Sequence, residues 1–121
     1  DLKSFNIIAD IVKRADIVNT TIAISIYDKT SKEASLICAK AADELLTISD
    51  ITASFVLGNT GEKICISGRS IGDINVQVIL EKLGGGGHIT LAGAQVEGMT
   101  IEETKQELIN RINEYFSEIE N

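Results

Sequence analysis

Helical and extended patterns alternate along this chain, and that alternation restricts its fold more than any other feature of the sequence. Apolar residues at helical spacing mark the expected helices, whereas runs rich in Ile, Val and Thr mark the expected strands. The expected helices span residues 2–14, 31–48, 73–83 and a last stretch that begins at Thr100. The expected strands span residues 21–27, 52–58, 63–69 and 92–96. Residues 1–121 show no internal boundary and are enough for one domain with its own core.

The connection between two of these strands predicts a mixed sheet. The loop Asn59-Thr60-Gly61-Glu62 is short and polar and contains a glycine, which is typical of a β-hairpin. Because helices separate the other strands, we predict an α/β (α+β) domain with a mixed sheet of about four to five strands packed with helices. Side chains alternate between two faces of the strand after the hairpin, with Ile64, Ile66 and Gly68 on one face and Cys65, Ser67 and Arg69 on the other.

Local signals set the ends of the expected helices. Residues 28–30, with the sequence Asp-Lys-Thr, are typical of a turn, and Ser31 is the predicted N-cap of the helix that follows. Gly84 suits the C-terminal cap of the third helix. The stretch Thr100-Ile101-Glu102-Glu103 is a capping box, which predicts the start of the final amphipathic helix.

The charge and the cysteines restrict the partners and the compartment. A net charge of −7 argues against charge-driven binding to long nucleic acids, but it leaves room for a small anion at one site. Cys38 and Cys65 stand in apolar surroundings and are predicted to be buried free thiols in a reducing compartment. No apolar run is long enough to span a bilayer, and no secretory signal is visible. Because the chain starts at Asp1 and not at Met, we expect it to be a piece of a longer protein.

Gly84–Gly87 form the most unusual segment, because they directly precede His88, the single histidine of the chain. Four ordered glycines cost backbone entropy, but a backbone without side chains can approach a ligand closely and turn its N–H groups toward an anion. The alternative is a helix cap followed by a loose loop. The segment lacks a Walker lysine, and its glycines end a helix instead of starting one, so the common phosphate fingerprints do not fit. A lone histidine without clustered ligands does not predict a metal site.

Arg69 is the second candidate, because it ends a strand within the stretch Ser67-Gly68-Arg69-Ser70. A guanidinium at this position can hold a phosphate through two parallel hydrogen bonds, with the hydroxyl groups of Ser67 and Ser70 as further donors. The alternative is an arginine that pairs with an acidic residue and closes the edge of the sheet. The sequence alone does not decide between these two roles.

Three segments taken together resemble the DHH-associated domain, the C-terminal substrate-binding half of the DHH-family phosphoesterases. They are Ser67–Ser70, Gly72–Val76 and Gly84–His88. The resemblance extends through Ala41–Leu46, so it covers most of the chain, and residues 73–79 are most similar to the membrane-bound cyclic-di-AMP phosphodiesterases of the GdpP type. One departure is Leu91, where the family often has alanine.

The resemblance implies a division of labour. A preceding DHH domain would hold a pair of metal ions, usually manganese, whereas this chain would grip the nucleotide without a metal or catalytic residue of its own. His88 would donate a hydrogen bond to a phosphoryl oxygen or stabilise developing charge as imidazolium. The implied substrate-binding residues are Ser67, Arg69, Ser70, Gly85, Gly86, Gly87 and His88.

The implied partners are a cyclic dinucleotide or short nucleotide and the DHH domain of the parent protein, with a homodimer left open. The parent would hydrolyse cyclic di-AMP at the cytoplasmic face of a bacterial membrane that this chain itself does not touch. Two alternatives stay open. The same family also acts on short oligoribonucleotides or phosphorylated adenosine nucleotides, and related domains at the end of alanyl-tRNA synthetases bind RNA or promote assembly.

Overall fold

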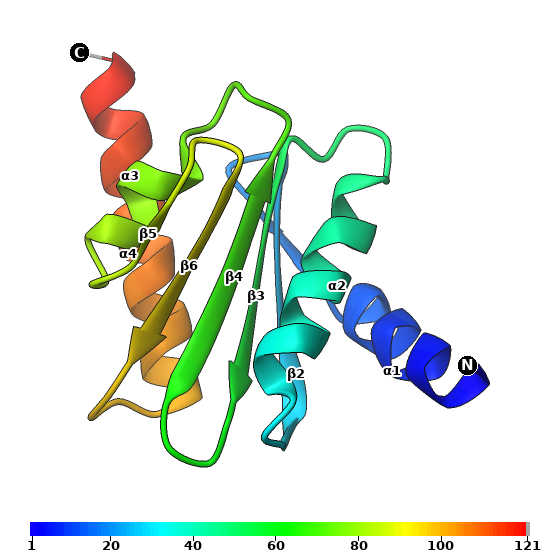
Figure 1. Cartoon of the computed structure of the whole chain (residues 1–121). Helices are drawn as coiled ribbons and strands as arrows, with labels where there is room; N and C mark the ends of the chain where they lie inside the picture. Colours follow the sequence, from blue (N-terminus) through cyan, green and yellow to red (C-terminus); the bar gives the residue numbers. More distant parts are fainter. Residues whose placement is uncertain (121) are drawn as a thin grey trace.

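The computed structural model describes residues 1–120 as one sheet between two layers of helices. Figure 1 shows α1 and α2 on one side of the sheet and α3 and α4 on the other. This arrangement confirms the predicted α/β class. The elements, in chain order, are α1 (Leu2–Lys13), β1 (Asp16–Val18), β2 (Ile22–Thr30), α2 (Ala34–Leu46), β3 (Ala53–Asn59), β4 (Ile64–Ser70), α3 (Val76–Glu81), β5 (Gly86–Gly87), β6 (Leu91–Val96) and α4 (Ile101–Glu120).

The sheet is mixed, as predicted, and has six strands in the order β1-β2-β3-β4-β6-β5. The pair β2–β3 is parallel and connected through α2, whereas the other neighbouring pairs are antiparallel. The predicted hairpin is confirmed as the connection between β3 and β4. The sequence patterns missed β1 and β5, because both are short and β5 consists of two glycines, which have low strand propensity.

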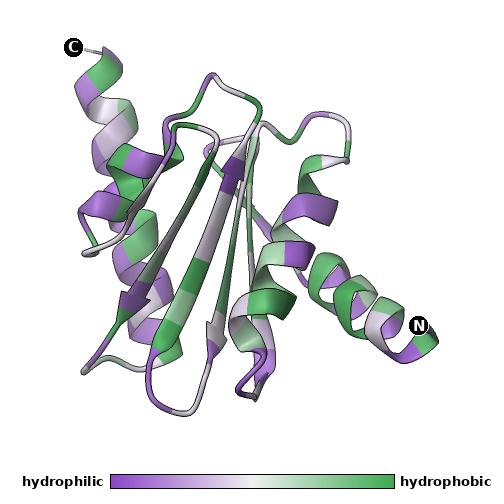
Figure 2. Ribbon diagram, viewed as in Figure 1, coloured by the Kyte–Doolittle hydropathy of each residue, from purple (hydrophilic) through white to green (hydrophobic). Residues whose placement is uncertain are grey.

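The alternation along β4 is confirmed by the two clusters of buried side chains that the sheet separates. Ile64 and Ile66 belong to the cluster shared with α3 and α4, whereas Cys65 belongs to the cluster shared with α1 and α2. In Figure 2 each helix alternates between hydrophobic and hydrophilic residues, as expected where one side of a helix packs on a sheet. The faces of β4 are therefore those that the sequence predicted.

Three predicted element ends are wrong. The expected turn at residues 28–30 is the end of β2, where Thr30 pairs with Asn59 after an irregularity in the register. Ser31 is not an N-cap, since α2 begins after Glu33, although the Ser31 hydroxyl accepts a hydrogen bond from the Glu33 N–H at 3.1 Å. The third helix is shorter than expected because Asn75 caps it, with its side chain accepting from the Val78 N–H at 3.1 Å.

The capping box at the start of α4 is confirmed and gives a first prediction. The Thr100 N–H donates to the Glu103 carboxylate at 2.9 Å, and the Glu103 N–H donates to the Thr100 hydroxyl at 3.1 Å. We expect Thr100→Ala to lower the free energy of unfolding by about 1 kcal/mol, because a donor at the helix end loses its partner. Urea denaturation measures this change. Ser117→Ala, an exposed position on the same helix, is the control and should not lower the stability.

Candidate functional site

One face of the sheet is left open where β4, β6 and β5 lie side by side. On that face α2 packs on β3 and β4, whereas α3 contacts β4, β6 and β5 from the opposite face. Figure 1 shows β6 and β5 at the end of the sheet remote from α1 and α2. We call this face of β4, β6 and β5 the open floor, although α2 packs along its β4 edge, where Ser67 is buried. Its middle carries small residues, since Ser67, Gly93 and Gly86 lie opposite one another across the three strands.

A second row on the open floor brings the two sequence candidates together. Arg69 of β4 is the register partner of Leu91 on β6. Beyond β5, the His88 N–H donates to the Leu91 carbonyl at 2.7 Å and the Leu91 N–H donates to the His88 carbonyl at 3.3 Å. Directly opposite residues of antiparallel strands point to the same face. Arg69, Leu91 and His88 therefore share the open floor. The backbones at Arg69 and His88 are two strand spacings apart, which is about 10 Å.

The open floor is hollowed beside this row into a depression of about 450 Å³. Its lining includes Gly84, Gly85 and Gly93, at which a ligand can approach backbone N–H and C=O groups closely. The depression is lined by Ser35, Cys65, Ile66, Ser67, Gly84, Gly85, Gly93, Ala94 and Gln95.

Two hydrogen bonds within the protein hold the Arg69 guanidinium. Its Nε donates to an Asp43 carboxylate oxygen at 2.7 Å, and its Nη1 donates to the Gly68 carbonyl at 2.9 Å. The Arg69 side chain is 13% exposed, whereas that of Asp43 is 64% exposed. The third nitrogen of the guanidinium, Nη2, has no hydrogen-bond partner within residues 1–120. The ion-pair role considered from the sequence is thus observed. The phosphate-binding role stays a prediction, for which the Nη2 group supplies unpaired donors.

The three glycines of the predicted site differ in what surrounds them. A Cβ on Gly85 would lie 2.2 Å from the Gly93 carbonyl oxygen, and one on Gly87 would lie 2.5 Å from the Leu91 carbonyl oxygen. Gly87 also has a φ of +145°, which side chains disfavour. Nothing lies within 4 Å of a Cβ on Gly86. Gly85 and Gly87 are therefore required by backbone packing, whereas Gly86 borders open space on the floor.

Gly84 performs the predicted helix-capping role. Its φ is +83°, and the next N–H, that of Gly85, donates to the Leu80 carbonyl at 2.8 Å. This cap turns the chain from α3 into β5. The glycine run is therefore a cap followed by a short paired strand, and not a loose loop.

Leu91, the departure from the family pattern, does not face the core. It is 50% exposed and lies between Arg69 and His88 in the second row of the open floor. His88 is also exposed, and Ile89, the next residue, is half exposed. An apolar surface therefore accompanies the imidazole and the guanidinium.

Ser70 is the one predicted site residue that the structure places elsewhere. It is buried on the face opposite to Arg69, where its hydroxyl donates to the Ile89 carbonyl at 3.3 Å and accepts from the Gly72 N–H at 3.3 Å. These bonds tie the end of β4 to the turn that carries His88. Ser70 thus fixes the turn that carries His88 from the opposite face of the sheet, and it does not line the site.

Several residues of the open floor were missed by sequence reasoning. Gly93 and Gln95 were assigned only to a strand, and Asp43 was noted only within a family segment. Period-2 alternation from Leu91 would have found Gly93 and Gln95. No local signal could have found Asp43, because it is 26 positions away from Arg69.

The cysteines are buried and free, as predicted, and both lie close to Gly58. A hydrogen bond from Cys38 lowers the pKa of Cys65 to about 6, while burial opposes this shift. The hydrogen bond to Cys65 and burial raise the pKa of Cys38 far above its usual range. Cys65 borders the depression.

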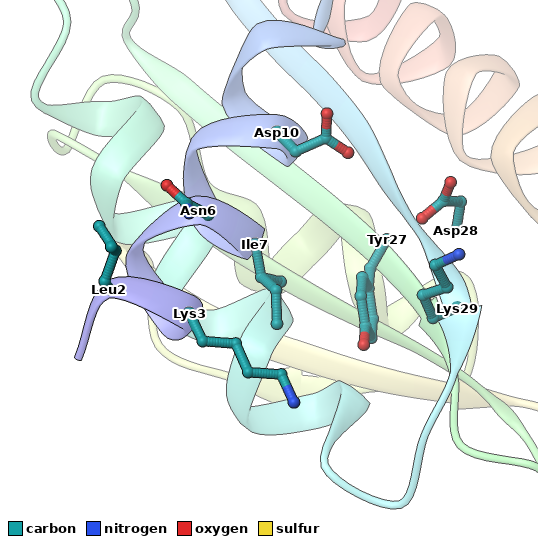
Figure 3. A pocket seen from close by; sticks show the side chains of 8 residues that line it. All are labelled: Leu2, Lys3, Asn6, Ile7, Asp10, Tyr27, Asp28 and Lys29. Atoms are coloured by element: carbon teal, nitrogen blue, oxygen red, sulfur yellow. The ribbon is translucent and has the colours of Figure 1, made fainter.

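A larger hollow of about 700 Å³ lies between α1 and β2 and contains none of the predicted site residues. Figure 3 shows Ile7 of α1 and Tyr27 of β2 between the two elements, with charged side chains around them. Two of these, Asp10 and Asp28, each lie 3.4 Å from Arg14 and are thus already paired. We place the candidate site on the open floor, because unpaired donors of Arg69 and bare glycine backbone lie there.

Within residues 1–120, no three side chains of His, Cys, Asp or Glu come together as a metal ion would require. No helix in this part of the chain combines the length and the hydrophobicity needed to cross a membrane.

Comparisons with known proteins show the family to which this chain belongs. The profile of the DHHA1 domain family matches residues 19–118. The cyclic-di-AMP phosphodiesterase GdpP of Geobacillus thermodenitrificans is 45% identical over 109 residues, which cover 89% of this chain and 17% of that protein. The cyclic-di-AMP phosphodiesterase PdeA of Listeria monocytogenes is 38% identical over 117 residues, which cover 96% of this chain and 18% of that protein. The chain thus spans less than a fifth of the length of these relatives.

Among solved structures, an exopolyphosphatase-related protein from Bacteroides fragilis has a similar fold. The TM-score is 0.81 at 18% sequence identity, and the match covers 100% of this chain and 37% of that chain. At this identity the likeness concerns the fold alone.

Proposed function

Because this chain belongs to the DHHA1 domain family, we propose that it is the nucleotide-binding part of a metal-dependent phosphodiesterase that hydrolyses cyclic di-AMP. The reaction adds one water molecule across one phosphodiester bond and yields the linear dinucleotide pApA. The proposal is supported by the names of the relatives that are 45% and 38% identical to this chain. In this proposal the chain is joined to a DHH domain within a longer protein.

The observation that carries the proposal is the row formed by Arg69, Leu91 and His88 on the open floor. The free end of the Arg69 guanidinium supplies N–H donors to a phosphoryl oxygen, and the His88 imidazole supplies another from the far side of the row. The backbone at Gly86 lets the phosphodiester approach without a steric clash. A base or ribose of the same nucleotide then meets the exposed side chain of Leu91.

The metal ions do not fit the residues of this chain. Residues 1–120 gather no set of three acidic, histidine or cysteine ligands. In the proposal, the manganese pair is therefore held by the DHH domain, and this chain binds and orients the nucleotide against it. No chemical step is assigned to a residue of this chain.

A second prediction follows for the isolated chain of residues 1–121. We expect it not to hydrolyse cyclic di-AMP in the presence of Mn²⁺, because residues 1–120 bring together no group of side chains that can hold a metal ion. We also expect calorimetric titration to show weak or undetectable binding, since half of the binding cleft is absent. Release of pApA in step with the amount of purified chain would contradict the proposal, as would micromolar affinity without added metal.

The substrate class is tested in the longer protein. Hydrolysis rates with Mn²⁺ are compared for cyclic di-AMP, for short oligoribonucleotides and for phosphorylated adenosine nucleotides. The proposal expects the highest kcat/KM for cyclic di-AMP. A preference for the linear oligonucleotides would keep the family and replace the substrate.

A further inference from the structure

Asp43 holds the guanidinium of Arg69 in a fixed orientation beside the open floor. A guanidinium has five N–H donors. The Nε–H donates to Asp43 at 2.7 Å, and one Nη1–H donates to the Gly68 carbonyl at 2.9 Å. These two contacts lie on different sides of the group, so together they fix its plane. The Nη1–Nη2 end is left with parallel N–H donors that match two oxygens of a phosphate.

Asp43 is itself anchored beside Arg69 through the adjacent residue on α2. The hydroxyl of Ser54, which is fully buried, donates to the Ala42 carbonyl at 2.7 Å. Ser54 is also the register partner of Arg69 across β3 and β4. The helix is therefore attached to the sheet one residue before Asp43 and one strand away from Arg69. The Ser54–Ala42 hydrogen bond fixes α2 on the sheet, and the Asp43–Arg69 hydrogen bond then fixes the guanidinium relative to α2.

We propose that Asp43 is a positioning residue that aims Arg69 at the phosphate of the substrate. The inference rests on the proposed function, since the phosphate is that of the proposed nucleotide. An exposed ion pair contributes little by itself, but Arg69 is only 13% exposed and the pair is short. The main effect of Asp43 is then on the orientation of the donors. Orientation matters in turnover, because a displacement of about 1 Å can lower the rate by about a hundredfold.

The proposal has a clear competitor. A carboxylate next to a guanidinium can also compete with the anionic substrate for it. In that case removal of the Asp43 charge would improve binding. In the positioning role, removal lowers turnover while the attraction of Arg69 for simple anions is not weakened. For Asp43→Asn, the two roles thus predict changes of opposite sign in kcat/KM: a rise if Asp43 competes with the substrate, and a fall if Asp43 positions Arg69.

The experiment uses Asp43→Asn, Arg69→Ala and the double variant in the longer protein. We expect Asp43→Asn to lower kcat/KM for cyclic di-AMP roughly tenfold, and the double variant to be no worse than Arg69→Ala alone. Inhibition by inorganic phosphate should not weaken in Asp43→Asn. Asp16→Asn is the matched control, since Asp16 pairs with Lys105 at 2.9 Å and has a similar exposure. It should leave kcat/KM unchanged.

A second readout does not depend on the substrate. In the isolated chain, the Nε–H signal of Arg69 should be visible by ¹H–¹⁵N NMR and lost to solvent exchange in Asp43→Asn. The signal is assigned from its absence in Arg69→Ala, since the chain has only Arg14 and Arg111 besides.

The outcomes separate the inference from the proposed function. Wild-type kinetics in Arg69→Ala would overturn the inference and the role of Arg69 in the proposed site, whereas a longer protein that does not hydrolyse cyclic di-AMP would overturn the proposed function. A slow Arg69→Ala with an unchanged or faster Asp43→Asn would overturn the positioning role alone, and so would additive losses in the double variant. A rapidly exchanging Nε–H in the unmodified chain would also overturn it.

Discussion

Gly85→Ala should be strongly destabilising, whereas Gly86→Ala, one residue later, should leave the stability almost unchanged. A Cβ on Gly85 would lie 2.2 Å from the Gly93 carbonyl oxygen and 2.7 Å from the Ala94 Cβ, so β6 would have to move away from the end of α3. Overpacking of this kind against backbone costs about 3 kcal/mol or more. The melting temperature should then fall by roughly 10 °C. Gly86 borders open space, so the methyl group of alanine meets nothing in the folded chain.

The same pair of variants separates folding from substrate binding. In the longer protein, Gly86→Ala places a methyl group where the backbone is expected to approach the phosphodiester. We expect kcat/KM for cyclic di-AMP to fall roughly tenfold or more, with a melting temperature close to that of the unmodified protein. Melting curves and Mn²⁺-dependent hydrolysis rates are measured for both variants. Wild-type turnover in a stable Gly86→Ala would show that this backbone does not contact the substrate.

Arg69→Ala should cause the second large effect, a loss of ten- to a hundredfold in kcat/KM of the longer protein. The reason is the loss of a charge-assisted contact to the phosphate, which is worth about 1.5–3 kcal/mol. Arg69→Lys should recover only part of the rate. An ammonium group keeps the charge, but it lacks the planar fork that the contacts to Asp43 and Gly68 orient.

His88→Ala is the companion variant across the same row. It removes the imidazole and keeps the backbone bonds to Leu91, so it should lower turnover without a change in melting temperature. Arg111→Ala is a control for the loss of an arginine, since Arg111 pairs with Glu107 and Glu114 on α4, away from the open floor. If Arg69→Ala and His88→Ala both fold normally and keep wild-type kinetics, the row has no role in binding.

The sequence by itself determined those features that depend on neighbours a few positions apart. The alternation along β4 placed Arg69 and Ser67 on one face and Ile64 and Ile66 on the other, because strand geometry has a period of two. The box that begins at Thr100 fixed the start of α4, because its partners are three residues apart. The segments Ser67–Ser70, Gly72–Val76 and Gly84–His88 together were enough to indicate the family, whereas the phosphate site that they imply stays a prediction.

Only the tertiary structure decided how these residues act. Gly85, Gly86 and Gly87 are identical in sequence, yet two are required by the backbone of β6 and one borders free space. The period of two already puts Ser70 on the face opposite to Arg69, but only the packing shows that its hydroxyl donates to the Ile89 carbonyl. Asp43 meets Arg69 from a helix 26 positions earlier. Such contacts depend on how α2, β4 and β6 pack, and packing is set by the whole core and not by any local pattern.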